Sequence, residues 1–536
     1  MADFLQHLLI CGGLAAVTLG LAAAGPVATG LSYGGAIVGS GSFRTDDPLM
    51  KEPRPLPVGK LQRNKISDAG DFLRETLLEP GEKQSTTRPT PSLDTNTLDE
   101  VPNGAWYTAR HYFHPMTDDE LFHGVDGTRP PSTEKPWEIY NAKLEGVTPG
   151  FRIRDARGEK YVIKFDPVDF IEMTTGADVV GARFFHALGY NVPDNYPVRF
   201  RRDQLRIGEN VEFLRQGKKV MMEQADLDHL LSKVPRYPDG TYRALASRLI
   251  AGDILGPFQF YGTRPDDPND DIPHERRRVL RGYYVFASWL DHTDSRAINT
   301  LDTIQQIDGV RAVRHYLIDF GATLGSDSLV PKQVWHGHTY TVDFLWGLKE
   351  IGTLGIHSAD WERMHYPVTP AVGRFTAETF EPDEWKPSYP NPAFDNRTIE
   401  DCFWAAKQVM AFTDQQIRTL VRAGAYSDPV AVETIARVLI ARRDKIGRYY
   451  LSKILPLDRF EVRSGELRFR DLGGGGNYSV TWSTFDNSTL RTQPMAGQNS
   501  FRVPRAPGRW LLAEISDGAH NAAVYLHDNS VVGVSR

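Results

Sequence analysis

The chain has 536 residues, which is long enough for two or three domains, each with its own hydrophobic core. Hydrophobic residues make up 40% and charged residues 24%, a globular composition that excludes an intrinsically disordered chain. The formal net charge of −6 argues against a generally polyanion-binding surface, so we expect no nucleic-acid partner beyond what a local basic patch could hold. Two cysteines exclude a disulfide-dense scaffold and a zinc module built on four thiolates.

The N-terminal segment, residues 1–43, is the one part of the chain that departs from this composition. No charged residue occurs from Leu8 to Phe43, and the apolar part at 8–28 is about long enough to span a bilayer. Small residues at Ala22–Ala24 suit signal-peptidase cleavage. An uncleaved anchor would leave the body in the cytoplasm, because the basic residues follow the segment, whereas a cleaved signal would export it. We therefore expect a membrane-associated or exported protein, with the side of the membrane left open.

The next part of the chain is predicted to be a linker and then a sheet. Residues 44–103 are rich in Pro, Thr, Ser and charge, with one helical stretch around 69–78. Short β-type runs separated by turn residues follow at 137–144, 151–155, 160–165 and 219–224. Between them, apolar residues at helical spacing predict a helix over 175–188 that stops at Gly189.

The middle of the chain is predicted to be mostly helical and its end to be β-rich. Val279, Tyr283, Phe286 and Leu290 form one apolar helical stripe. A hairpin is predicted from 300 to 320 with its turn at Asp308-Gly309, and helices over 398–453. From 460 onward the apolar period changes to two and turns recur every eight to twelve residues, which predicts a small β-sandwich. The fold class is therefore α+β.

Chemistry-bearing side chains gather after the predicted central helix. Asp294 is followed by Arg296 and by Asn299, and Asp319 comes at the end of the hairpin, in the tripeptide Asp-Phe-Gly. Phosphoryl transfer needs a carboxylate near the attacking hydroxyl, oxygen ligands for Mg²⁺ and a cation on the phosphates. An Asp and an Asn five residues apart can present the first two groups from one loop. A second Asp on the hairpin can meet the Asn across a metal ion.

This pattern resembles the catalytic loop and the metal-binding motif of the protein-kinase-like superfamily. The resemblance implies that Asp294 is the catalytic base and that Asn299 and Asp319 hold the metal. Arg296 stands where protein kinases usually carry a phosphate-contacting Lys, so the charge is kept while a point charge becomes a planar fork. His292 begins the motif, but Thr293 follows it in place of Arg.

Upstream residues extend the resemblance. Tyr161-Val-Ile-Lys164 is similar to the strand whose Lys contacts the α- and β-phosphates. The loop from Gly146 to Gly150 precedes it where a phosphate-covering loop should lie, although it has only two glycines and a proline. Asp178 would replace the helix Glu that pairs with Lys164, with Glu172 as the alternative.

The sequence from the predicted helix into the following Pro is similar to atypical kinases of the HipA and spore-coat CotH types. In this comparison Val220–Glu223 is the hinge strand beside the adenine, which assigns Glu223 to nucleotide binding. The resemblance implies a two-lobed kinase-like domain, with an N-lobe at 104–224, a helical C-lobe at 225–455 and a C-terminal β-rich domain at 456–536.

Two functions follow from the resemblance. The first is an ATP- and Mg²⁺-dependent enzyme that transfers the γ-phosphoryl group to an unidentified hydroxyl acceptor. The second is a catalytically silent pseudokinase that binds or scaffolds at the cell envelope, which the poor glycine loop and the Asp at 178 favour. No Ala-Pro-Glu motif follows Gly321, which argues against protein-kinase specificity.

Ordinary structural roles stay open for the same residues. Lys164 could be a solvated charge, Asp294 and Asn299 turn residues, Asp178 a first-turn acid and Arg296 a partner for a carboxylate. An acid at 319 is different, because its apolar neighbours would make its burial costly without a cation.

Three further clusters have simpler interpretations. The acidic run at 266–271 could hold Ca²⁺, but it lacks the Gly and the distal Glu of an EF-hand loop, so a solvated loop is favoured. His336 and His338 alternate as metal ligands can, without a third ligand in view. Arg276–Arg278 is predicted to be a solvated helix face.

Overall fold

The computed structural model describes residues 48–536 except 79, 84, 86–88, 126–128, 143–149, 216–217, 343–359 and 364–368. The predicted anchor or signal at 1–43 lies outside the described residues. Among the helices of the described ranges, none combines the length and the apolar composition that a bilayer crossing requires.

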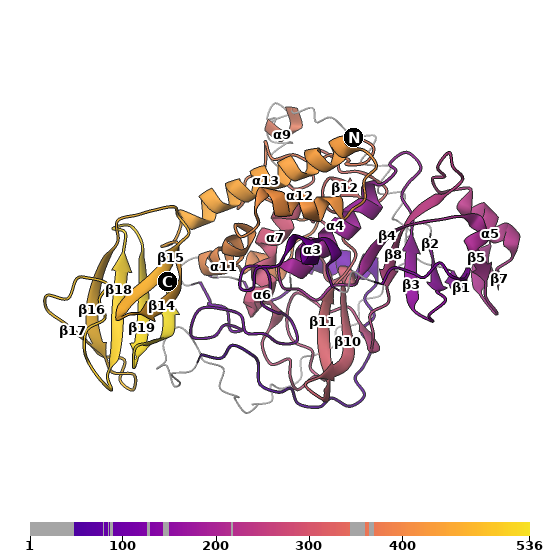
Figure 1. Ribbon diagram of the computed structural model, residues 1–536. Helices are drawn as coiled ribbons and strands as arrows, with labels where there is room; N and C mark the ends of the chain where they lie inside the picture. The colour runs from indigo at the N-terminus through magenta and orange to yellow at the C-terminus, as the bar shows by residue number, and fades with distance from the viewer. Residues whose placement is uncertain are drawn as a thin grey trace. The chain divides into compact units, whose positions relative to one another are not determined.

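A six-stranded sheet forms the first part of the fold, at the magenta and purple end of the ribbon in Figure 1. Its strands, in the order in which they lie side by side, are β4 (Asn195–Phe200), β8 (Tyr242–Arg248), β3 (Lys160–Lys164), β2 (Gly150–Arg154), β1 (Trp137–Ala142) and β5 (Leu205–Ile207). All neighbours are antiparallel except β1 and β5. Alternate residues such as Tyr161 and Ile163 are buried in the sheet's core, as the period of two in the sequence predicts.

Helix α4 (Met173–Ala187) follows β3 and contacts β4 and β8. It begins two residues before the predicted start, and it ends before Gly189, which has a φ of +105°. Nearly every side chain of α4 is buried, so the helix lies in the core on most of its circumference.

The predicted hinge strand lies elsewhere. Lys218–Met221 forms β7, which pairs only with β6 (Glu212–Arg215) in a separate two-stranded sheet, followed by α5 (Gln224–Leu231). The strand beside β3 is β8, whose first five residues are buried. Both β6 and β7 are mostly exposed, so they supply little apolar surface with which to compete for that central place.

The predicted hairpin is present as β10 (Thr300–Ile307) and β11 (Val310–Leu317), with β9 (Asp253–Gly256) on its other edge. Asp308 and Gly309 both have positive φ, as a two-residue hairpin turn requires. The pair β12 (Ser326–Asp327) and β13 (Val330–Pro331) follows shortly after.

The helices in the described middle of the chain are η3 (His274–Arg276), α6 (Arg278–Arg281), α7 (Tyr283–Leu290), η4 (Ala297–Asn299), α9 (Asp360–Arg363), α10 (Pro392–Asp395), α11 (Ile399–Val409), α12 (Asp414–Arg422) and α13 (Pro429–Leu451). Their shared core contains Phe286, Trp289 and Trp404. The prediction that this part is mostly helical holds for 399–451, whereas loops and strands predominate in the described residues before it. The prediction that Arg276–Arg278 is a solvated face is wrong for two of its members, because Arg277 and Arg278 are buried and ion-paired.

The predicted linker also differs from the structure. The helix predicted around 69–78 is present as α2 (Asp68–Leu73) and a π-helical turn, η1 (Arg74–Leu78), and shorter helices follow at α3 (Asp118–His123) and later at η2 (Arg202–Gln204). Val58, however, is buried against residues of β9, β10 and β11, and Asn64 donates a backbone hydrogen bond to Leu255. The described part of 48–103 therefore packs on the rest of the structure. Its scattered apolar residues are buried singly, without a helical or strand period, so the sequence pattern does not predict this packing.

The C-terminal region contains two sheets, drawn in light orange and yellow in Figure 1. One sheet pairs β14 (Leu457–Arg463) with β15 (Glu466–Asp471). The other has the order β17 (Thr492–Pro494), β16 (Ser479–Phe485), β18 (Trp510–Ser516), β19 (Asn521–His527) and β20 (Ser530–Ser535). Leu457, Leu467, Trp482 and Ile515 belong to one core that draws on both sheets. This is the mixed α and β architecture that the α+β prediction requires, with its β-rich end in the expected place.

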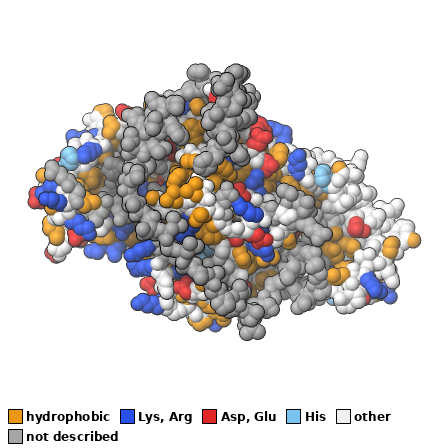
Figure 2. Space-filling view, turned by 180° about the vertical axis from the view of Figure 1, so that it is seen from behind, with side chains coloured by type: hydrophobic (Ala, Val, Ile, Leu, Met, Phe, Trp, Pro, Cys, Tyr) orange, Lys and Arg blue, Asp and Glu red, His pale blue; other side chains and the backbone are white. Residues whose placement is uncertain are grey.

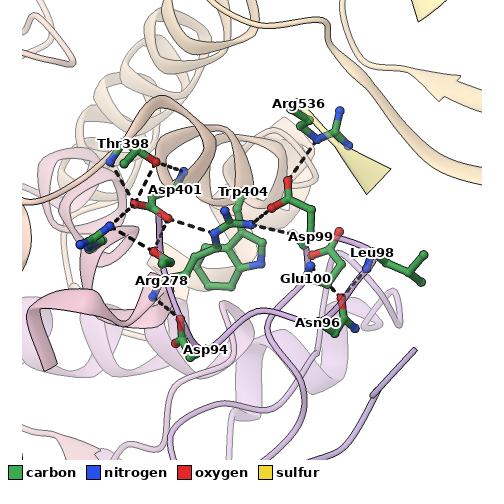
Figure 3. Close-up of polar contacts among 12 residues, drawn as sticks. Asp94, Asn96, Leu98, Asp99, Glu100, Arg278, Thr398, Asp401, Trp404 and Arg536 are labelled. Carbon is green, nitrogen blue, oxygen red and sulfur yellow. Dashed lines mark hydrogen bonds and ion pairs between the residues drawn. The ribbon is translucent and has the colours of Figure 1, made fainter. Parts of the chain in front are cut away.

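A buried ionic cluster joins segments that are far apart in sequence (Figure 3). Arg278 of α6 lies 3.0 Å from Asp401 of α11 and also pairs with Asp99. Arg536 pairs with Asp99 at 3.3 Å and with Asp458 of β14 at 3.1 Å. These contacts fix the 94–100 segment between the helices and the C-terminal strands. On the surface, by contrast, Lys and Arg side chains lie beside Asp and Glu side chains over the described part of the face in Figure 2.

Candidate functional site

Lys164 is the last residue of β3 and lies at the centre of a small ionic cluster. Its Nζ is 2.9 Å from Asp319 Oδ1, just beyond β11, and 3.4 Å from Asp178 Oδ2 on α4. The side chain of Asp178 is 2% exposed and that of Asp319 is 46% exposed. One ammonium group therefore bridges a buried carboxylate and an accessible one.

Two further contacts hold Asp178 against the chain that follows the hairpin. Its Oδ1 accepts hydrogen bonds from Asn195 Nδ2 at 2.8 Å and from the backbone N–H of Phe320 at 3.3 Å. Gly181, one turn further along α4, has no room for a side chain, because a Cβ there would lie 2.6 Å from Phe320 Cβ. The glycine thus lets α4 approach the segment that carries Asp319.

The loop after Phe320 is anchored to the same helix. Thr174 Oγ1 of α4 donates to the Ser328 carbonyl and lies 3.2 Å from Ser326 Oγ. Thr323 Oγ1 donates to the Ala177 carbonyl at 3.3 Å. These bonds give Asp319 a fixed frame on both sides, although its own φ is +61°, in the left-handed region.

The protonation of the cluster follows from its burial and its charges. Burial raises the pKa of Asp178 to about 6, and the charge of Asp319 adds to this effect while Lys164 opposes it. For Lys164, burial alone would lower the pKa, but Asp319 and Asp178 together raise it above its ordinary value. The ammonium group is therefore charged at neutral pH and places a positive charge beside the exposed carboxylate of Asp319.

A second set of polar groups occupies the loop between α7 and β10. Arg296 Nε lies 2.8 Å from Asp294 Oδ1, and Asn299 Nδ2 donates to Asp294 Oδ2 at 2.7 Å and to its backbone carbonyl at 2.8 Å. The backbone N–H of Ile318 donates to the Asn299 carbonyl at 3.0 Å, so this loop runs directly beside the residue that precedes Asp319. The sequence-predicted Asp294, Arg296, Asn299 and Asp319 thus come from adjoining backbone segments.

His292 supports this loop from within the core. Its Nδ1 lies 2.7 Å from Ser295 Oγ, and its ring contacts Phe185 and Phe320. Burial lowers the pKa of His292 to about 4, so the imidazole is neutral at neutral pH. A neutral ring adds no charge to this apolar site, so its role there is to support the loop through its contacts.

The structure does not bring all predicted residues to this place. Gly146 lies outside the described residues, whereas Gly150 pairs with Lys164 across β2 and β3. Glu223 caps α5, is 68% exposed and pairs with Arg215, away from β3. Glu172 is buried against Tyr237, Ser427 and Arg243, so the partner of Lys164 is Asp178 and not Glu172.

The acidic run at 266–271 is partly buried and paired. Asp270 lies 2.8 Å from His274 Nε2 and 2.9 Å from Arg277. Burial would raise the pKa of Asp270, but the hydrogen bond to His274 and the charge of Arg277 hold it below its usual range. The preference for a solvated loop is therefore wrong for Asp270, which is buried and already has partners within the chain.

The two histidines of the 336–338 stretch are held by other contacts. His338 stacks on Trp361, and His336 Nδ1 accepts from the Gln333 N–H. Within the described residues, no group of three or more His, Cys, Asp or Glu side chains is placed to hold a metal ion by itself.

The side chains of the cluster could supply some, but not all, of the ligands that a nucleotide and its metal ion need. Asp319 offers carboxylate oxygens, and Asn299, whose Nδ2 is bonded, offers its Oδ1. These residues fit Mg²⁺ only if phosphate oxygens and water complete the shell, which is the usual arrangement for this ion. Lys164 offers an ammonium group as a cation for such phosphates.

Sequence reasoning missed Asn195 and Gly181. Neither has a motif signal, because Asn195 acts through one bond to Asp178 and Gly181 through the space that it leaves. Comparison with known protein families, curated proteins and solved structures found no match to this chain.

Proposed function

We propose that the chain is an atypical kinase-like phosphotransferase that binds ATP with Mg²⁺ and transfers the γ-phosphoryl group to a hydroxyl acceptor. The observation that carries the proposal is the position of Lys164, within 3.4 Å of both Asp178 of α4 and Asp319 after the hairpin. In phosphotransferases of the kinase type, a strand lysine pairs with an acid on the next helix and a second acid holds the metal.

The strand order supports the same function. Three antiparallel strands, β1, β2 and β3, lead to the lysine, and α4 lies in the connection from β3 to β4. With Lys164 on the phosphates and Asp319 and Asn299 on Mg²⁺, the proposed reaction breaks the bond between the γ-phosphorus and its bridging oxygen. The acceptor oxygen forms the new bond, Asp294 accepts the hydroxyl proton, and ADP leaves.

A thermal-shift titration of the full chain with ATP and Mg²⁺ tests nucleotide binding. We expect a metal-dependent rise in Tm in the parent that disappears in Asp319→Ala, because ligand at 100 times Kd stabilises the folded state by about 2.7 kcal/mol. Asp444→Ala is the matched control, since its carboxylate is 39% exposed and paired with Arg443 at 2.7 Å. An unchanged Tm over millimolar ATP would contradict the proposal.

One observation favours the silent binding module instead. Both carboxylate oxygens of Asp294 have partners within the chain, Arg296 on Oδ1 and Asn299 on Oδ2. These contacts give the carboxylate a structural role within its own loop. Transfer of labelled γ-phosphate decides between the two functions: transfer that is lost in Asp294→Asn supports the enzyme, and nucleotide binding without transfer or hydrolysis supports the binding module.

A further inference from the structure

A cavity of about 240 Å³ lies between η1 with the residues that follow it and the segment at α10. Its lining includes Glu75 of η1 together with Pro390, Pro392 and Asp395 at α10. The volume is below the range of about 300–1,000 Å³ that is typical of sites for whole small molecules. It suits one charged group of a larger substrate.

Two contacts connect the cavity wall to the loop of Asp294. Asn391, which caps α10, donates from Nδ2 to the Ser295 carbonyl at 2.9 Å. The guanidinium of Arg296 lies over the ring of Tyr389 at 4.7 Å, and Phe72 of α2 packs edge-on against the same ring at 5.5 Å. α2 also contacts η4, so the elements beside the cavity adjoin the loop of Asp294.

Glu75 is the unusual residue of this lining. It is 3% exposed, and neither of its carboxylate oxygens accepts a hydrogen bond from any residue in the part of the chain that the structure describes. A buried polar group without a partner costs about 1–3 kcal/mol, and a charged one costs more. A ligand that pairs with the Glu75 carboxyl would explain why the cavity wall carries this group.

The charges around Glu75 define which ligand that is. Asp71 and Asp395 face it with like charge, and Arg74 and Arg296 face it with opposite charge. Glu82 and Lys83 complete the charged lining, and Glu82 is already paired with Arg276. Burial raises the pKa of Glu75 to about 8, with Asp71 and Asp395 adding to the effect. A cation in the cavity would let this carboxyl ionise.

We propose that the cavity binds an ammonium or guanidinium group of the phosphoryl acceptor, with the Glu75 carboxylate as its partner. The inference rests on the proposed phosphotransferase function and names its substrate class: a hydroxyl compound that carries a cationic group beside the hydroxyl. An anionic head group would meet the acids of this lining, and a neutral group would leave the Glu75 carboxyl protonated.

Binding of a cation by ionised Glu75 has a specific pH dependence. Because only the ionised form binds, the apparent affinity scales with its fraction. That fraction rises from about 1% at pH 6 to about half at pH 8 for a group that titrates near 8. Affinity should therefore increase by about 50-fold over this range, with release of about one proton per cation bound at pH 6.

The experiment measures binding of butylammonium and of ethylguanidinium to the full chain by calorimetry at pH 6, 7 and 8, without nucleotide. In Glu75→Gln, which keeps the shape of the side chain, we expect at least tenfold weaker binding and no pH dependence. Glu82→Gln is the matched control, because Glu82 lines the same cavity but has Arg276 as its partner.

Each outcome decides a separate point. Equal binding of the parent and Glu75→Gln, or equally tight binding of neutral butanol, overturns the inference while nucleotide binding can still hold. Cation binding in a chain that fails to bind ATP with Mg²⁺ overturns the assignment to an acceptor. If both bind, a serine peptide with an arginine beside the serine should accept phosphate at least tenfold faster than its citrulline analogue, and an equal rate would overturn the substrate class.

Discussion

The molecule contains two buried ionic clusters that differ in how completely they are paired. In the cluster of Figure 3, Arg278 and Arg536 face Asp94, Asp99, Glu100 and Asp401. Arg281, Lys407 and Asp458 extend the cluster, so several cations are shared among its carboxylates. At the candidate site, one ammonium, Lys164, faces two carboxylates.

Protonation varies within the first cluster as well as between the two. Burial alone would raise the pKa of Asp401, but Arg278 and Arg281 hold it below the usual range, whereas burial raises the pKa of Glu100 in the same cluster to about 7. At the candidate site, burial raises the pKa of Asp178 to about 6. The clearer difference is accessibility, because the Asp319 side chain is 46% exposed and its carboxylate can therefore meet a cationic ligand such as Mg²⁺.

Removing one carboxylate from the cluster of Figure 3 should have the largest effect on stability. Asp401→Ala leaves Arg278 and Arg281 buried without their shared carboxylate, so we expect a loss of about 3–5 kcal/mol in the free energy of unfolding. Urea denaturation measures it. Glu433→Ala, in an exposed pair with Arg418, is the control and should cost about 0.2–1 kcal/mol. Equal losses in the two variants would show that the buried cluster is not structural.

Lys164→Met should have a smaller effect on stability and a larger one on ligand binding. Asp178 can take up a proton once the ammonium is gone, so we expect a loss of only about 1–3 kcal/mol. The affinity for ATP with Mg²⁺ should fall at least tenfold in a fluorescence or calorimetric titration. Lys160→Met, at the exposed start of the same strand, is the control for β3. An unchanged affinity would remove Lys164 from the nucleotide site.

The pH dependence of stability separates the clusters further. Asp178 has a folded pKa near 6, above its unfolded value of about 3.8, so its contribution is full below pH 4 and is lost as the pH rises through 6. We expect the parent to lose about 1–3 kcal/mol over this window relative to Asp178→Asn, in which the group does not titrate. Parallel stability curves for the two proteins would contradict the raised pKa.

The smallest effect is expected at Glu223. Its side chain is 68% exposed and lies at the start of α5, so Glu223→Ala should change ATP affinity by less than about twofold and stability by less than about 0.5 kcal/mol. A tenfold loss of affinity would contradict this prediction and would place Glu223 in the nucleotide site, which would then reach α5.

The parts of the site that sequence predicts best are those with fixed spacing. Lys164, Asp178 and Asp319 come together as their order along strand, helix and hairpin suggests. The hinge strand was misplaced because the buried strand beside β3 contains Ala244-Leu-Ala246, a run with weak β-propensity. Val220 is the β-branched residue of β7, but that strand is largely exposed.

Long-range charge pairing was the other failure. Arg277 and Arg278 stand in a basic run that predicts a solvated face, yet their partners come from Asp270, Asp99 and Asp401. The partners of Arg278 lie more than a hundred residues away, where no local window identifies them, although Asp270 is only seven residues from Arg277. The same limit explains why the packed segment at 48–103 was predicted to be a linker.

The anchoring of the Asp319 loop to α4 has a consequence for kinetics. Thr174 and Thr323, with the close approach of Phe320 to Gly181, make helix and loop a single rigid piece. If the proposed phosphotransferase function holds, an incoming nucleotide would meet its charged groups already in register, so little ordering entropy would be lost on association. Turnover of that enzyme would then be limited by release of product or by admission of the acceptor, and not by a slow rearrangement of α4.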